Sequence, residues 1–236
     1  GQSRRICWAC GKGTAPLWRV EFHCHTAASK DSLVSPKDLV AEAARRGIDR
    51  LIVTDHNRLE GALRARELDP ERVIVGEEIK TTRGELLAAF VSEHVPPNLT
   101  PLETIARLRD QGAFISVSHP FDLQRHGWPL PDLLEIAPHV DAIEVFNARC
   151  LHARMNDQAA EFARQHHLVG TVGSDAHTLG ELGQATLLLP PFTSAEELQR
   201  VIWDGQAQTR LSPFWVHFYS TLARWRKRIQ PRLNRL

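Results

Sequence analysis

The sequence lacks the features that mark secreted, membrane-spanning and disordered proteins. Its 236 residues include only four cysteines, and the single Cys-x-x-Cys, Cys7 with Cys10, has no free second pair at finger-like spacing. We therefore expect neither a disulfide framework nor a zinc finger, and we expect a cytoplasmic protein. No run approaches the roughly 20 consecutive apolar residues of a transmembrane helix, and no apolar signal segment opens the chain. With 42% apolar residues, general disorder is excluded.

The small net charge of +1 hides an uneven distribution. Residues 1–20 carry four Lys or Arg and no acid, and residues 220–236 carry six and no acid. The remaining residues, 21–219, hold 19 basic residues, all 28 acids and all 12 histidines, for a net charge of −9. Carboxylates and neutral imidazoles are the common ligands of divalent metals, so the acidic body is where we look for a metal site.

Strand-like and helix-like segments alternate along the chain from about residue 18. The apolar patterns predict strands over 18–25, 50–54, 73–75, 84–91, 114–118, 142–146 and 168–172. Helices are expected from Ser35-Pro36 to Gly47 and over 61–68, 100–110, 156–166 and 194–204. This alternation indicates βαβ units, and about seven short strands favour an α/β barrel. We divide the chain into a tail (1–18), the barrel (19–212) and a C-terminal aromatic and basic segment (213–236).

Side chains with metal-binding groups follow the predicted strands, where barrel active sites lie. His23 and His25 are two apart in a strand and therefore share one side, and Asp175 and His177 repeat that spacing. The other strand ends carry Asp55-His56, Glu77-Glu78, His119 and Asn147. Core packing does not explain charged groups at five strand ends, because buried charges are costly unless they are paired or bound to metal. The pattern predicts a multinuclear metal site.

The ordered motifs resemble those of the PHP (polymerase and histidinol phosphatase) superfamily over about residues 20–205. They read His23-Cys24-His25-Thr26, Ser29-Lys30-Asp31-Ser32, Thr54-Asp55-His56, Gly76-Glu77-Glu78-Ile79, His119-Pro120-Phe121, Glu144-Val145-Phe146-Asn147 and Gly173-Ser174-Asp175-Ala176-His177. The resemblance implies a distorted (β/α)7 barrel that hydrolyses phosphoesters with two or three divalent ions. It carries the ligand role to His23, His25, His56, Glu78, His119, Asp175 and His177.

Two ligand positions depart from the family pattern. The acid after the first histidine pair falls at Asp31 instead of at Lys30, and Glu85 stands where many members have a histidine. Glu85 is either an oxygen ligand, which would favour harder ions such as Mn²⁺, or a turn residue. We expect Mn, Fe or Zn as the metal.

Phosphate binding and proton transfer need further residues. Arg149, Arg125 and Arg58 follow the predicted strand ends and are our candidates for substrate-phosphate binding, together with Asn147. The leaving oxygen could take its proton from His126 or Asp55. The C-terminal segment is expected to dock Trp215, Phe218 and Leu222 on the barrel, with a solvated basic tail; the alternative is a nucleic-acid or membrane-surface role.

The sequence thus predicts an enzyme in which metal-activated water hydrolyses a small phosphomonoester or nucleotide. The alternatives are a 5′→3′ exonuclease on short RNA or DNA, a non-hydrolytic metal-binding module of a nucleic-acid complex, and an amidohydrolase-type barrel. The amidohydrolase alternative is disfavoured because Glu78 stands where a carboxylated lysine would be expected. The oligomeric state is left open.

Overall fold

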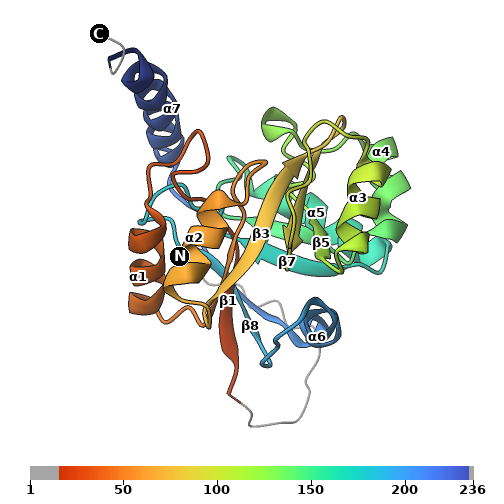
Figure 1. Ribbon diagram of the computed structural model, residues 1–236. Coiled ribbons are helices and arrows are strands. Elements are labelled where there is room, and N and C mark those ends of the chain that lie inside the picture. Colours follow the sequence, from red (N-terminus) through yellow and green to blue (C-terminus); the bar gives the residue numbers. More distant parts are fainter. Residues whose placement is uncertain (1–15, 234–236) are drawn as a thin grey trace.

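The structure is a computed structural model that describes residues 16–233 (Figure 1). Cys7 and Cys10, and with them most of the tail predicted for 1–18, lie outside these residues. Within the described range, nine strands form one sheet in the order β7-β6-β5-β4-β3-β2-β1-β8-β9. In the described part of the chain, no helix is both long enough and apolar enough to cross a bilayer.

Seven of the strands form a barrel-like sheet that is nearly closed. Their bounds are Trp18–Cys24 (β1), Arg50–Val53 (β2), Val73–Lys80 (β3), Glu85–Ala89 (β4), Phe114–Val117 (β5), Ala142–Asn147 (β6) and Val169–Gly173 (β7). The backbone N–H of His25 donates to the carbonyl of Ala176 just after β7 (2.9 Å), which joins the two ends of the sheet. This arrangement confirms the predicted α/β barrel class.

Strand β4 departs from the expected parallel order, because it pairs antiparallel with both β3 and β5. The turn over 81–84 is too short for a helical crossover, so the chain reverses directly. Two strands were not predicted, Ala185–Leu189 (β8) and Gln206–Thr209 (β9). β8 pairs antiparallel with the first half of β1, and β9 extends the sheet beyond it.

Helices other than the last one, α7, lie on the outside of the sheet (Figure 1), and three of them begin at sequence-encoded caps. The bounds of the helices are Pro36–Arg45 (α1), Glu60–Leu68 (α2), Pro101–Asp110 (α3), Leu130–Ile136 (α4), Ala153–Gln165 (α5), Ala195–Val201 (α6) and Val216–Leu233 (α7). The side chains of Ser35, Thr100 and Ser194 each accept a hydrogen bond from a first-turn N–H. Helix α4 was not among the predicted helices, and it forms because Leu133 and Ile136, three apart, both enter the core.

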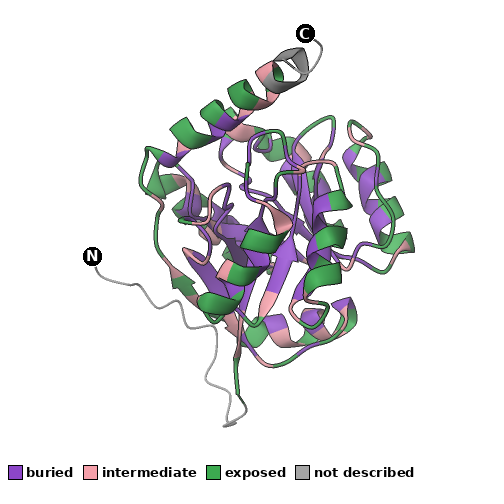
Figure 2. Cartoon of the chain, turned by 60° about the vertical axis from the view of Figure 1, so that its left-hand side comes forward, coloured by how far each residue is buried: buried purple, intermediate pink, exposed green. Residues whose placement is uncertain are grey.

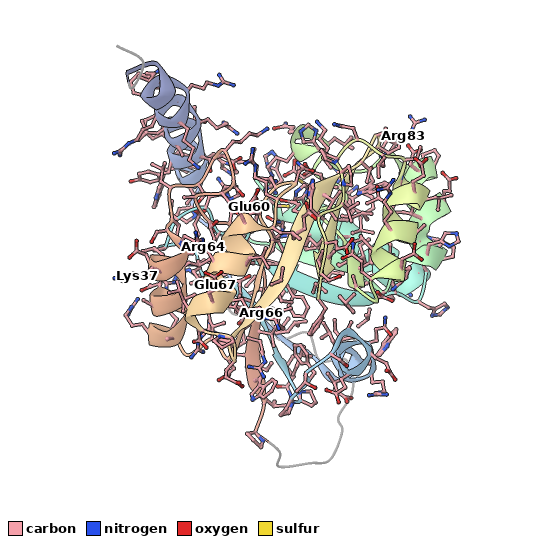
Figure 3. All side chains as sticks on the ribbon, viewed as in Figure 1. Lys37, Glu60, Arg64, Arg66, Glu67 and Arg83 are labelled. Carbon is pink, nitrogen blue, oxygen red and sulfur yellow. The ribbon has the colours of Figure 1, made fainter. Side chains whose placement is uncertain are left out.

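The layers follow the usual separation of apolar and charged side chains. The apolar residues of β1, β2 and β5 belong to the buried core (Figure 2). Phe22 of β1 and Phe114 of β5 meet within it, with their ring centres 6.5 Å apart. On α2, Ala62 and Ala65 face the core, whereas Arg64, Arg66 and Glu67 point to solvent (Figure 3). One rim of the barrel, at the carboxyl ends of the parallel strands, departs from this separation because it contains buried charged and polar side chains.

Helix α7 projects from the body beside this rim (Figure 1). It docks through Val216, Ser220 and Ala223, which are buried. Trp215, Phe218 and Leu222, which were expected to pack on the barrel, are exposed instead, so that expectation is wrong. The small residues make the contact because they let the helix approach the rim loops closely, and the large apolar residues occupy the opposite face.

Candidate metal centre

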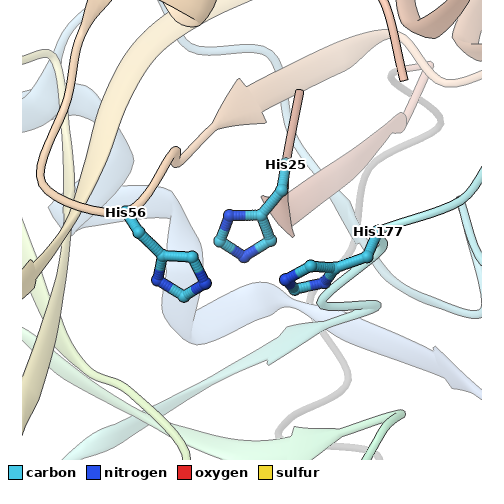
Figure 4. A group of neighbouring side chains, drawn as sticks. All are labelled: His25, His56 and His177. Carbon is cyan, nitrogen blue, oxygen red and sulfur yellow. The ribbon is translucent and has the colours of Figure 1, made fainter. Parts of the chain in front are cut away.

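Five histidines from four elements converge at the rim. His23 and His25 lie at the end of β1, His56 follows β2, His119 follows β5 and His177 follows β7. The ring centre of His25 lies 4.3 Å from that of His56 and 4.2 Å from that of His177. Figure 4 shows these three rings pointing toward one another. The register of the barrel therefore brings together side chains that are 31 to 152 residues apart in sequence.

Carboxylates lie between the histidines. Glu78, in β3, is within 2.9 Å of His56 Nδ1 and 3.3 Å of His23 Nε2 through Oε2, and 3.2 Å from His119 Nε2 through Oε1. Asp175 Oδ1 lies 3.2 Å from His25 Nε2. Glu78 thus contacts histidines on both sides of the cluster, the position that a bridging ligand would need.

Three sets of ligand atoms are spaced as a metal ion requires. Within each set, one atom from each residue lies within 4.8 Å of the others. The sets are His25, His56 and His177; His23, His25 and Asp175; and Glu78, Glu85 and His119. We call these residues, with the adjacent Asp31, the rim cluster. Asp31 Oδ1 lies 3.4 Å from His177 Nε2 and 3.6 Å from His56 Nε2.

Divalent ions fit the rim cluster. Among the described residues, His23 Nε2, His25 Nε2, Asp31 Oδ1 and Glu78 Oε2 are buried without a hydrogen-bond partner. Unpaired buried polar atoms are costly, so their concentration at one place calls for a ligand. Neighbours also orient two of the imidazoles: His23 Nδ1 lies 2.9 Å from Glu144 Oε1 and His25 Nδ1 lies 3.2 Å from Ser29 Oγ. With their protons at Nδ1, both rings present a free Nε2 lone pair.

Comparison with known proteins identifies the family of the chain. The PHP domain family matches residues 21–126, and the PHP-associated family matches residues 153–207. A relative from Methanocaldococcus jannaschii, described as an uncharacterized protein, is 36% identical over 171 residues, which cover 71% of this chain and 68% of the relative. The chain belongs to the PHP family. The predicted family and enzyme class, a metal-dependent phosphoesterase, are thereby confirmed.

Two further similar proteins are informative. A protein of Enterobacter sp. strain 638, named a probable phosphatase, is 26% identical over 207 residues, 72% of this chain and 83% of the relative. The crystal structure of PsfC from Pseudomonas syringae superimposes with a TM-score of 0.64 at 19% identity, covering 89% of this chain and 98% of PsfC. The structural likeness supports the fold, and the sequence relatives support the family.

In this PHP domain, Asp55 does not face the rim cluster. It is fully buried and accepts hydrogen bonds from the N–H and hydroxyl of Thr26 and of Ser29, between 2.5 and 3.2 Å long. These four bonds leave it poorly placed to protonate a leaving group. Ser29 Oγ also contacts His25 Nδ1, so we propose instead that Asp55 positions His25 through Ser29.

The candidate phosphate-binding residues divide into two kinds. Arg125 contacts Asp122 Oδ2 (2.8 Å) and Asp175, and Arg149 contacts Glu181 Oε1 (3.1 Å) with only 4% of its side chain exposed. Both arginines are thus occupied by carboxylates. Arg58 is exposed in the loop after β2 and is free to meet a substrate. Arg149 also donates from Nη2 to Ser220 Oγ (2.9 Å), which ties α7 to the rim.

Two other predicted residues lie outside the rim cluster. Asn147 is buried and its Nδ2 donates to Glu144 Oε2 (3.0 Å) and Asp175 Oδ2 (3.2 Å), so it orients carboxylates instead of facing the open rim. His126 is exposed and adopts the left-handed conformation (φ 65°). As a proton donor, His126 stays a prediction that no contact of the rim cluster supports.

Burial and neighbouring charges shift the pKa values of the rim cluster. Burial, together with the charges of His177 and His56, lowers the pKa of His25 to about 3 and keeps it neutral. Burial disfavours the imidazolium of His56, but Glu78 and further carboxylates outweigh it and raise its pKa to about 10. Burial and the charge of Glu78 raise the pKa of Glu85 to about 7. The carboxylates of the rim cluster therefore favour the protonated form of His56, whereas His25 is neutral.

Sequence reasoning did not assign a role to Glu144 or Ser29, although both stand in motifs that the PHP resemblance uses. Glu144 is buried in β6, where Oε1 contacts His23 Nδ1 and Oε2 accepts from the N–H of His119 (2.8 Å). The available signal was a carboxylate inside an apolar strand, which is costly unless it is paired. Ser29 offered no such signal, because a single serine in a loop is common.

Proposed function

We propose that this PHP-family protein hydrolyses nucleotide-sized phosphomonoesters. The observation that carries the proposal is the position of the rim cluster beside an open groove of about 1090 Å³. Pockets for small ligands span roughly 300 to 1,000 Å³, so the groove suits a substrate larger than inorganic phosphate. The name of the relative in Enterobacter, a probable phosphatase, supports the same reaction class.

The lining of the groove supports an anionic substrate. Lys30, Arg58 and His56 line it at the rim, and Leu59, Leu63 and Pro97 add an apolar wall. The cationic side chains suit phosphate oxygens, and the apolar wall suits the organic part of the ester. Arg58 therefore remains our candidate for phosphate binding, with Lys30 beside it.

The rim cluster would hold two or three divalent ions through the histidines and carboxylates described above. When bound, such ions lower the pKa of a coordinated water and offset the charge of the phosphoryl oxygens. The chain's own groups prepare this centre: Glu144 and Ser29 orient His23 and His25. Arg125 pairs with Asp175 through Oδ2, whereas His25 contacts Oδ1 of the same carboxylate. Arg58 would hold the substrate phosphate from the groove.

The experiment is a steady-state comparison of Mn²⁺-loaded protein on AMP, an aryl phosphomonoester, an aryl phosphodiester and a 5′-phosphorylated oligonucleotide. We expect phosphomonoesters to be hydrolysed best. We expect Glu78→Gln to lower kcat/KM by more than about 100-fold, since even residues behind metal ligands contribute about 10- to 100-fold. Exclusive turnover of the oligonucleotide would favour an exonuclease instead, and no turnover of any ester would refute the proposal.

Arg58 gives a sharper test of the groove. Arg58→Gln should raise KM for AMP by roughly tenfold with kcat little changed, because it removes an interaction made equally in the ground and transition states. Arg64→Gln, on the outer face of α2, is the matched control and should leave both constants unchanged. Equal effects of the two substitutions would show that the groove does not bind substrate.

A further inference from the structure

The outer face of α7 carries an exposed apolar stripe. Phe218, Leu222 and Trp225 are 68%, 42% and 62% exposed, and their spacings of four and three residues place them on one side of the helix. Ile229, four residues further, continues the row. In Figure 2, exposed residues cover the side of α7 that faces away from the body. The helix is thus amphipathic with its large apolar residues turned to solvent.

Basic residues flank the stripe. Arg226 and Arg228 are exposed on either side of it, and residues 205–236 contain no Asp or Glu. Two more exposed aromatic residues, Phe214 (78%) and Trp215 (55%), precede the helix. A row of aromatic and aliphatic side chains bordered by Lys or Arg is the signature of a helix that lies in the interface of a bilayer.

We propose that α7 docks on an anionic lipid bilayer surface. The stripe enters the boundary between headgroups and acyl chains, and Arg226 and Arg228 meet the lipid phosphates. The charge of α7 and the mixture of apolar and basic residues favour a bilayer over the two other partners that this face could bind, a second copy of the chain and a nucleic acid. A second copy of the chain docking through the same stripe would bring basic helices together, and α7 has no acid to offset the repulsion. A nucleic acid would use the arginines and the aromatic rings, but it would leave Leu222 and Ile229 without a function.

Docking does not require α7 to leave the barrel. Ser220, on the opposite face, accepts a hydrogen bond from Arg149, and Lys227 Nζ donates to the carbonyl of Ala27 (2.6 Å). Arg224 Nη1 lies 3.7 Å from Asp31 Oδ2. The buried face is thus held at the rim while the stripe is free. Membrane binding by this face is independent of the proposed hydrolysis, because no residue of the stripe contacts the rim cluster.

The test is co-sedimentation of the full chain with two kinds of vesicle, with the blue shift of tryptophan emission as a second readout. One kind is phosphatidylcholine alone, and the other contains phosphatidylcholine and phosphatidylglycerol in a ratio of about 3:1, which gives the negative surface that basic helices bind. We expect binding to the mixed vesicles, weakened by salt, and little binding to the neutral ones. Binding that is equal for both would refute the role of charge.

Variants separate the stripe from its flanks. Phe218→Ser with Trp225→Ser should lower the partition coefficient at least about tenfold, because it removes buried apolar area. Arg226→Gln with Arg228→Gln should lower it by about fivefold for each arginine. Trp203→Ser is the matched control. Trp203 is 50% exposed in the short helix Ile202–Asp204 directly after α6, and α6 and α7 lie at opposite ends of the molecule (Figure 1), so its loss should not change vesicle binding.

Three outcomes would overturn the proposal. The first is failure of the protein to bind the mixed vesicles. The second is an equal loss of binding in the stripe variant and in Trp203→Ser. The third is a dimer or an oligonucleotide complex that forms through the stripe when no vesicle binding is detected. Thermal unfolding of each variant checks that it folds. AMP hydrolysis measured without vesicles should be unchanged in the stripe variant, so failure of the membrane proposal is distinguishable from failure of the proposed activity.

Discussion

Replacing Arg149 by methionine should destabilise the protein by about 3 kcal/mol, because it leaves a buried carboxylate without its counter-charge. Arg149 is 4% exposed and Glu181 is 2% exposed. Their contact, Nε to Oε1 at 3.1 Å, does not have hydrogen-bond geometry, and both atoms are without a hydrogen-bond partner among the described residues. Breaking a buried ion pair costs about 3 to 5 kcal/mol, and the imperfect geometry places this pair at the low end.

The same pair predicts a rescue. Glu181 still accepts hydrogen bonds from the N–H of His177 (3.2 Å) and the hydroxyl of Thr178 (2.9 Å) when Arg149 is gone, but its charge is uncompensated. Arg149→Met with Glu181→Gln removes that charge and should recover more than half of the lost stability. Arg64→Met breaks an ion pair of which both members are exposed, and it should cost no more than about 1 kcal/mol.

Urea denaturation followed by circular dichroism measures these differences, with the free energy of unfolding obtained by linear extrapolation. If the slope of the unfolding free energy against urea concentration is the same in all variants, they expose comparable surface on unfolding. A loss in Arg149→Met as small as the loss in Arg64→Met would refute the reasoning, and so would a double variant that is less stable than Arg149→Met. Either result would mean that Glu181 is solvated or protonated in the folded protein.

Three further predictions concern the packing, the ions and the charge of this PHP domain. Gly61→Ala should lower the melting temperature and weaken Mn²⁺ binding, because an added Cβ would lie 2.0 Å from Asp55 Oδ2. Gly180→Ala is the control: the added Cβ has room there, so neither the melting temperature nor Mn²⁺ binding should change. Saturating Mn²⁺, at about 100 times its dissociation constant, should add about 2.7 kcal/mol of stability that EDTA removes; a melting temperature unaffected by EDTA would contradict ion binding. Hydrogen bonds from Arg45 and Arg46 lower the pKa of Glu42 to about 2. The stabilisation by Glu42 is therefore present above its usual pKa near 4.5 and is lost as the pH falls through about 2. In urea titrations, Glu42→Gln should cost less than about 1 kcal/mol at pH 7, and the cost should shrink as the pH is lowered toward 2.

Much of the barrel could be predicted from periodicity. The strand predicted over 18–25 is β1, Trp18–Cys24, because an alternating apolar segment between turn residues has few other conformations. Strand β9, Gln206–Thr209, escaped prediction because its residues are polar and partly exposed, so no apolar pattern marks it. It is a strand because β8 offers an unpaired edge, and that condition comes from the tertiary fold and not from the local sequence.

The positions of the candidate ligands were predictable for a related reason. His23 and His25 follow an identifiable strand, and the ends of parallel strands meet at one rim, so their proximity to His56 and His177 followed from topology. Arg149 could not be judged in this way. Its place two residues after Asn147 indicates a side of the strand, but Glu181, the partner that occupies it, lies on another loop, and no pairwise rule connects the two from sequence.

The contacts of Arg149 and the wrong expectation for α7 have one physical cause. Amphipathic periodicity shows that Phe218 and Leu222 share a face of the helix, but it does not show which face is buried. That depends on tertiary packing. Here Arg149 donates a hydrogen bond to Ser220, so the face that carries Ser220 packs on the barrel. The arginine that we expected to hold the substrate holds the helix. Since Arg149 also contacts Glu181, whose carboxylate accepts from the His177 N–H, the buried face of α7 is coupled to a candidate ligand. Substitutions on the buried face should therefore disturb the rim cluster, whereas substitutions on the exposed stripe should leave it intact.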